Sequence, residues 1–344
     1  MTIWRGHDRP VAELVGALGG ERLHHAWLLA GPAGIGKAGV AVDFAKRLLG
    51  AAPADDGEGA GTMMFASAPT PGGLSMPADD SVARLVDAGT HPDLIRIHRL
   101  HRDAKKGESP TLARNITVDQ VRGLSRFLHL APSMAGRRVI LIDAAEDMER
   151  GAANALLKNL EEPPKNTIFL LISHTPGRLL PTIRSRCRTL HFQRLADPDM
   201  AIVLETLLPA MPEAARQALI RGAEGSPGRA LAMGDLDLAG LETVLDRIAG
   251  SGDPTNRDRI QLARALAPKA AQARYEAFLE FVPHYIARRL RTERGHGKGA
   301  LADAWSEAVA AGRGATTLSL DPTATVFALC GAVARLAGKE VSAG

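Results

Sequence analysis

The stretch Gly-Pro-Ala-Gly-Ile-Gly-Lys-Ala at 31–38 constrains the fold of this chain more than any other. The apolar run 26–30 before it predicts a buried strand, and residues 40–49 after it predict a helix. Between a strand and a helix, such glycines let backbone N–H groups converge on phosphate oxygens, while the lysine supplies positive charge. We therefore predict a nucleotide-phosphate site at Gly31, Gly34, Gly36 and Lys37. The alternative is a tight strand-to-helix turn whose lysine is simply solvated.

Two positions of this predicted site lack the side chains that hydrolysis requires. The residue after the lysine commonly carries a hydroxyl that binds Mg²⁺, but here it is Ala38, and a methyl group cannot ligate a hard cation. A predicted strand at 138–143 ends in Asp143, a suitable carboxylate for holding the metal, yet Ala144 stands where a catalytic glutamate often follows. The sequence thus predicts either a phosphate-binding relic or a structural site that holds ATP or ADP without hydrolysis.

Composition indicates a globular chain of two or three domains. The 344 residues are 45% hydrophobic and 23% charged, and aromatic residues make up only 4%, which disfavours stacking platforms for single-stranded bases. The net charge of +4 is compatible with nucleic acid nearby. We expect a cytoplasmic protein without a membrane span, because no apolar run approaches the ~18 residues needed. Cys187 and Cys330 are expected to be reduced thiols.

The first half of the chain alternates between strand and helix patterns. Thr117 and Gln120 have the spacing of a capping box before a predicted helix at 117–128. Continuous apolar strands between helices predict a doubly wound parallel sheet, with the phosphate loop at the carboxyl end of its strand. The remaining predicted helices are 8–18, 81–87 and 152–162, and the remaining strands are 93–97, 167–172 and 189–194.

The later part of the chain is predicted to be helical. Short helical patterns occupy 197–235, and longer ones follow at 260–267 and 275–290. Asp321 and Pro322 form a suitable cap and first position for a last helix, which would bury Cys330. From spacing alone, this part is a helical bundle.

Two segments carry a resemblance to a known family. Asn154-Ala-Leu-Leu-Lys-Asn-Leu-Glu-Glu-Pro-Pro164 and Leu180-Pro-Thr-Ile-Arg-Ser-Arg-Cys187 resemble the clamp-loader family of AAA+ proteins, and the order of elements agrees from about 5 to 229. The resemblance implies that Arg186 is an arginine finger, which reaches the terminal phosphate of ATP on a neighbouring subunit. A fixed guanidinium there stabilises developing phosphoryl charge. Taken alone, Arg186 would be an ordinary surface arginine between Arg184 and Arg188.

The resemblance also implies a domain organisation and a set of ligands. It implies an AAA+ P-loop domain at 1–195, a small helical lid at 196–235 and an all-helical collar at 236–344 that joins its counterparts into a ring. Arg229 in the lid is a candidate nucleotide contact. Many members carry a zinc module after the P-loop helix, but the insertion at about 50–90 contains no cysteine. We therefore predict no bound zinc.

Three functions follow from these observations. The first is a non-catalytic subunit of the DNA polymerase III clamp loader, part of the holoenzyme, which offers Arg186 in trans while the sliding clamp is placed on primed DNA. Its partners would be the ATPase subunits, the clamp-opening subunit, the clamp and, through the complex, primer-template DNA. The second is an ATP-hydrolysing motor subunit of the same loader. The third is a separate DNA-binding adaptor that uses the basic residues of 99–114.

Overall fold

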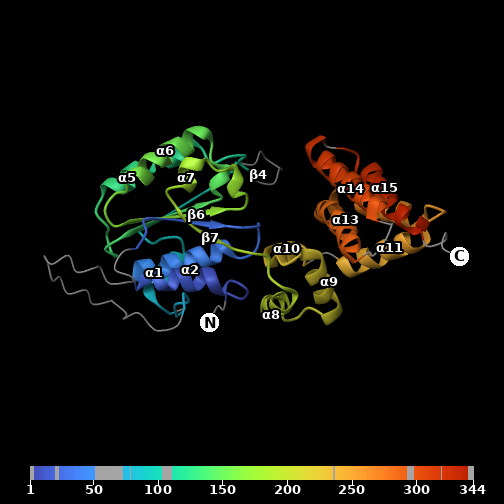
Figure 1. The fold of residues 1–344 in the computed structure, drawn as a ribbon, viewed down its shortest axis with the longest axis horizontal. Coiled ribbons are helices and arrows are strands. Elements are labelled where there is room, and N and C mark those ends of the chain that lie inside the picture. The colour runs from blue at the N-terminus through green and yellow to red at the C-terminus, as the bar shows by residue number, and fades with distance from the viewer. Residues whose placement is uncertain are drawn as a thin grey trace. The chain divides into compact units, whose positions relative to one another are not determined.

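The chain folds into two compact units, Met1–Asp199 and Met200–Gly344. The computed structural model describes residues 4–19, 23–50, 73–77, 79–102, 111–234, 237–292, 298–318 and 320–339 (Figure 1). The first unit contains the sheet, and the described part of the second unit is helical. The three-domain division stays a prediction. Residues 51–72 of the expected insertion lie outside the described residues.

A five-stranded parallel sheet forms the centre of the first unit, which confirms the predicted fold class. Its order is β2-β5-β6-β1-β7, so β1 lies between β6 and β7. In register, Ala30 of β1 stands beside Ser173 of β6 and His191 of β7. The strands are β1 (Ala26–Ala30), β2 (Leu94–His98), β5 (Arg138–Asp143), β6 (Thr167–Ser173) and β7 (Arg188–His191). A separate antiparallel pair joins β3 (His101–Arg102) and β4 (Thr111–Leu112).

Helices cover both faces of the sheet, as the unbroken apolar strands predict. Helices α1 and α2 lie on one side, and α5, α6 and α7 lie on the other (Figure 1). Alternate residues of β1 serve the two faces. Ala26 and Leu28 belong to the core beneath α6. On the other face, the ring of Trp27 packs edge to face against the ring of Phe44 on α2, with 5.9 Å between the ring centroids. Burial on both faces therefore fixes the place of β1 inside the sheet.

The helices of the first unit agree closely with the predicted ranges. The capping box is present, because Thr117 Oγ1 accepts the N–H of Gln120 and the Gln120 side chain accepts the N–H of Thr117. The single helix predicted at 117–128 is divided at Gly123, a residue of low helix propensity. The helices are α1 (Asp8–Leu18), α2 (Lys37–Gly50), α3 (Ser81–Asp87), α4 (Val118–Arg122), α5 (Leu124–His129), α6 (Arg150–Glu161) and α7 (Pro181–Arg184), with short 3₁₀ turns η1 (Ala145–Asp147) and η2 (Pro176–Arg178).

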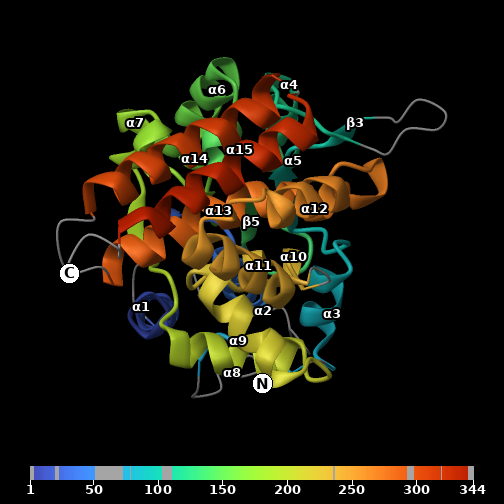
Figure 2. The ribbon, with the colours of Figure 1, turned by 90° about the vertical axis from the view of Figure 1, so that its right-hand side faces the viewer.

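The second unit is a helical assembly in its described part. Helix α15 packs against α12 and α14, and α13 also packs against α14 (Figure 2). Asp321 caps α15 by accepting the N–H of Ala324 at 2.7 Å, and Cys330 is fully buried, as predicted. The elements are α8 (Asp197–Leu207), α9 (Glu213–Ala223), α10 (Pro227–Ala232), α11 (Leu238–Ser251), α12 (Arg257–Leu266), η3 (Lys269–Ala271), α13 (Gln272–Thr292), α14 (Lys298–Leu318), α15 (Pro322–Ala334) and η4 (Arg335–Lys339).

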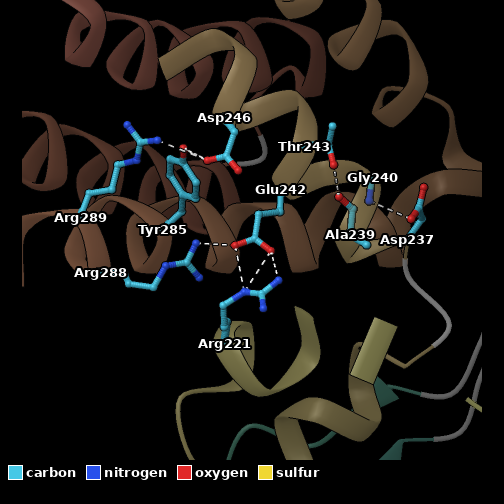
Figure 3. A network of polar contacts seen from close by, with 10 residues as sticks. All are labelled: Arg221, Asp237, Ala239, Gly240, Glu242, Thr243, Asp246, Tyr285, Arg288 and Arg289. Carbon is cyan, nitrogen blue, oxygen red and sulfur yellow. Dashed lines mark hydrogen bonds and ion pairs between the residues drawn. The ribbon is translucent and has the colours of Figure 1, made fainter. Parts of the chain in front are cut away.

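A buried carboxylate ties three helices of the second unit together. Glu242 of α11 is 8% exposed and accepts hydrogen bonds from Arg221 of α9 at 2.8 Å and from Arg288 of α13 at 2.5 Å (Figure 3). Burial acts to raise the pKa of Glu242, but the two guanidinium groups outweigh it and lower that pKa. Tyr285 of α13 adds a bond to Asp246 at 2.6 Å. The ranges predicted as lid and collar are therefore bonded directly to each other.

No helix within the described ranges combines the length and apolarity needed to cross a membrane.

The close approach of Gly31 to β7 gives a first prediction. Gly31 has φ +155°, and a Cβ atom there would lie 2.3 Å from the carbonyl oxygen of Phe192. We expect Gly31→Ala to lower the free energy of unfolding of the first unit by about 2 kcal/mol or more, because backbone must move. Gly177→Ala is the matched control, since nothing lies within 4 Å of that position. Equal urea midpoints for both variants would contradict this prediction.

Candidate functional site

The phosphate loop lies where β1 ends. The N–H of Gly31 donates to the carbonyl oxygen of Ser173 on β6 at 3.1 Å, and the N–H of Phe192 donates to Ala30 at 2.8 Å. Gly34 and Gly36 have φ +74° and +102°, values that L side chains rarely adopt. The loop then enters α2 directly at Lys37. The predicted strand-loop-helix context is thus present, with its glycines at the positions that need them.

Lys37 turns back into this loop. Its Nζ donates to the carbonyl oxygen of Gly31 at 2.6 Å and also to that of Pro32, and the residue is 2% exposed. Burial lowers the pKa of Lys37 to about 8, although the nearby carboxylates of Asp143 and Glu146 act in the opposite direction. This burial excludes the alternative in which the lysine of a tight strand-to-helix turn is simply solvated.

Acidic and polar groups gather at the carboxyl ends of β5 and β6. Asp143 ends β5, and its Oδ1 lies 3.9 Å from Nε2 of His174, the residue after β6. Burial raises the pKa of Asp143, while His174 and Lys37 act to lower it. The structure thus brings Asp143 into electrostatic reach of Lys37, as expected for residues at one edge of a parallel sheet.

Glu146 has a structural task that the sequence did not reveal. Its Oε1 accepts the N–H groups of His174 at 2.7 Å and Thr175 at 3.0 Å, which fixes the turn after β6. Its Oε2 is buried without a hydrogen-bond partner, and so is the hydroxyl of Ser173 at the end of β6. Buried polar atoms of this kind normally have partners. These two atoms leave hydrogen-bonding capacity beside the phosphate loop.

The N-terminal segment packs on the phosphate loop, which sequence reasoning missed. Trp4 Nε1 donates to Asp43 Oδ2 at 3.0 Å, and the ring of His7 is 2.7 Å from the carbonyl oxygen of Ile35. A Cβ atom on Gly39 would lie 2.2 Å from the Trp4 ring. Gly39 precedes the helix predicted at 40–49 and lies inside the observed α2, where an interior glycine often marks a close packing contact.

The residues present fit a phosphate group better than they fit a magnesium ion. The glycine loop and Lys37 supply donors for an anion, but Ala38 has no oxygen and Ala144 is a buried methyl group. Among the described residues, no group of three or more His, Cys, Asp and Glu side chains could hold a metal ion. The expectation of no zinc stays a prediction, because most of the insertion lies outside those residues.

Arg186 lies at the opposite edge of the sheet from the phosphate loop. It precedes β7, whose first residue, Arg188, pairs with Trp27 near the start of β1. The loop follows the last residue of β1. At ~3.3 Å per residue, the three steps of β7 from Arg188 to His191 span roughly 10 Å, and Arg186 lies in the turn before Arg188. The guanidinium is half-buried and pairs with Glu161 of α6 at 2.8 Å.

Cys187, the next residue, is partly buried against the core, where it packs as a small hydrophobic side chain. Burial raises the pKa of its thiol to about 12, so it is not poised as a nucleophile. Cys187 and Cys330 are both free thiols, which confirms the sequence prediction.

Arg229 is engaged inside the second unit. Its guanidinium donates to Glu280 of α13 at 3.2 Å and lies 4.0 Å from Glu224, and its Nη1 is 3.2 Å from the ring of His284. Its backbone N–H is accepted by Ser226, the cap of α10. A nucleotide contact at Arg229 stays a prediction, and it would require the guanidinium to exchange these partners.

The sheet order, the glycine loop with its buried lysine and the helices on both faces define an α/β domain of the P-loop type, followed by a helical unit. The family model described as "DNA polymerase III, delta subunit" matches residues 74–196. The resemblance to clamp-loader proteins is therefore confirmed over this part of the chain.

Similar curated proteins agree with that match. The chain is 41% identical over 203 residues to DNA polymerase III subunit delta' of Pseudomonas aeruginosa, covering 59% of this chain and 52% of that protein. It is 36% identical to the delta' subunit of Escherichia coli, over 56% of this chain and 54% of that protein. It is also 31% identical to the tau subunit of Escherichia coli, over 84% of this chain and 40% of that protein. The matches thus span about half the length of the delta' relatives.

The burial of Lys37 predicts a pH dependence of stability. The pKa of Lys37 is about 8 in the folded chain, whereas an unperturbed lysine has a pKa of 10.5. Between pH 8 and pH 10.5 this lysine therefore binds more protons in the unfolded chain than in the folded chain. Stability from this group therefore rises with pH across that window and is lowest below it. We expect the unfolding free energy of the wild type, relative to Lys37→Met, to rise by about 3 kcal/mol from pH 8 to 10.5. Urea titrations would measure it.

The control is Lys165→Met, which removes an exposed lysine. The difference in unfolding free energy between the wild type and Lys165→Met should not change with pH in the way that the difference from Lys37→Met does. Parallel pH curves for the wild type and Lys37→Met would contradict the burial of a charged ammonium group.

Proposed function

We propose that this chain is a delta'-type subunit of the DNA polymerase III clamp loader that supplies Arg186 in trans to a neighbouring ATPase subunit. The observation that carries the proposal is the place of Arg186. The side chain is 35% exposed and lies at the sheet edge opposite its own phosphate loop. A guanidinium in that position is suited to a nucleotide on another chain and not to its own.

The phosphate loop itself supports a non-catalytic role. The position after Lys37 offers no oxygen for Mg²⁺, the position after Asp143 offers no carboxylate, and Glu146 is committed to the turn after β6. We propose that ATP or ADP binds here without hydrolysis. The glycine geometry and the unpaired Ser173 hydroxyl support phosphate binding.

The proposed role brings a set of partners. These are the ATPase subunits, the clamp-opening subunit, the sliding clamp and, through the assembled complex, primer-template DNA. We propose that the second unit joins its counterparts in a hetero-oligomeric ring, in the cytoplasm and without membrane contact. The mutual bonding of α9, α11 and α13 supports a stiff connection between lid-like and collar-like helices.

The motor subunit is the second candidate. The similarity to tau over 84% of this chain favours it, and so does the retention of Lys37 and Asp143 at one site. Hydrolysis would require a water-activating base, and the geometry supplies none at Ala144.

Arg186→Ala tests the proposed finger. We expect the variant to fold and assemble, and we expect ATP turnover by the reconstituted complex to fall at least tenfold, because transition-state charge on the neighbouring phosphate loses a donor. Arg184→Ala is the matched control, since it removes an exposed arginine two residues away. Unchanged turnover in fully assembled Arg186→Ala complex would exclude the finger.

The purified chain tests the proposed state of the phosphate loop. We expect a labelled ATP analogue to bind without Mg²⁺-dependent turnover, and we expect Lys37→Ala to weaken binding at least tenfold by removing the buried cation. Lys165→Ala should bind like the wild type. Turnover by the single chain that disappears in Lys37→Ala would instead support the motor subunit.

A further inference from the structure

The guanidinium of Arg186 is restrained from both of its Nη atoms. Nη2 pairs with Glu161 Oε1 at 2.8 Å. Nη1 donates to the carbonyl oxygen of Thr182 at 3.0 Å and lies 3.4 Å from the hydroxyl of Ser185. Thr182 and Ser185 belong to the same turn as Arg186, whereas Glu161 is the last residue of α6. Glu161 is therefore the contact that draws the side chain away from its own turn.

The chain ends α6 at this point for a clear reason. Pro163 and Pro164 follow after a single residue, and proline cannot continue a helix. The carboxylate of Glu161 is consequently presented at the helix end beside the turn 182–186, where α6 and α7 pack. Glu162, next in sequence, makes no ion pair or hydrogen bond through its side chain among the described residues. Of the two adjacent glutamates, only Glu161 faces Arg186.

We propose that Glu161 is a latch that holds Arg186 against α6 and competes with the neighbouring subunit's triphosphate for the guanidinium. This inference rests on the proposed finger function of Arg186. A guanidinium neutralised by a carboxylate stabilises phosphoryl charge less well, so the ion pair must open or be shared when the finger engages. Glu161 is thus a positioning residue that acts through Arg186 and touches no nucleotide itself.

The exposure of the pair suits this role. The side chains of Arg186 and Glu161 are 35% and 48% exposed, so solvent screens their attraction. Ion pairs as exposed as this one shift an equilibrium by no more than about fivefold. A polyanionic phosphate chain can displace such a contact, whereas a fully buried pair would hold the finger permanently.

The latch predicts an effect on affinity and not on the chemical step. Removing the ion pair destabilises only the state in which the finger is disengaged, and therefore favours the ground state and the transition state of the engaged complex equally. In the reconstituted complex, we expect Glu161→Gln to lower the KM for ATP about two- to fivefold with kcat unchanged. Glu162→Gln, which removes the adjacent charge, should leave both constants as in the wild type.

The double variant Glu161→Gln with Arg186→Ala decides whether Glu161 acts through the finger. We expect Glu161→Gln to have no effect on KM in the Arg186→Ala background, because the guanidinium that pairs with Glu161 is absent there. An unchanged KM in the single variant, or the same shift in Glu162→Gln, would overturn the latch. A fall in kcat confined to Glu161→Gln would overturn it too, because Glu161 would then support the engaged finger.

The two proposals fail in different ways. If Arg186→Ala leaves turnover unchanged in the assembled complex, the finger itself is excluded. If Arg186→Ala lowers turnover while Glu161→Gln behaves like Glu162→Gln, the finger stands and only the latch is excluded.

Discussion

The parallel pairing of β1 with both β6 and β7 is the constraint on which the candidate sites depend. Because the three strands run in the same direction, every group that follows a strand lies at one edge of the sheet and every group that precedes a strand lies at the other. Lys37 comes after β1, and Asp143 ends β5, which runs parallel to β6, so both reach the same edge. Arg186 precedes β7 and is carried to the opposite edge. The parallel direction of these strands thus separates the proposed nucleotide site from the proposed finger.

Charge at the phosphate loop is only partly balanced within the chain. Lys37 is removed from water, which disfavours its charged form, while its bond to the carbonyl oxygen of Gly31 and the charges of Asp143 and Glu146 compensate in part. An anionic ligand would restore the missing negative charge. In the proposed function, phosphate would bind this loop whether or not the loop can hydrolyse it. Binding and hydrolysis would then depend on different residues, because Lys37 is present while Ala38 and Ala144 offer neither a metal ligand nor a base.

The second unit shows how polar groups define an arrangement that apolar packing alone would leave less specific. Glu242 is buried and satisfied by arginines from two other helices, so a shift of α9 or α13 would remove one of the two partners of a buried charge. Arg229 is similarly drawn to Glu280 on α13. These contacts join the regions that a clamp-loader resemblance divides into lid and collar. The free energy that holds them together comes from a few charge-assisted bonds in addition to the apolar core.

The sequence by itself determined the parallel sheet, the phosphate loop, the capping box at Thr117 and the burial of Cys330, because each depends on local spacing and apolar periodicity. It also predicts Lys37, Asp143 and Arg186 as site residues, an assignment that stays a prediction. Only the tertiary structure decided how their side chains are used. The return of Lys37 into its own loop, the tasks of Glu146 and Trp4, and the pairing of Arg186 with Glu161 join residues distant in sequence. No local pattern encodes such contacts, since they depend on where the packed elements bring each side chain.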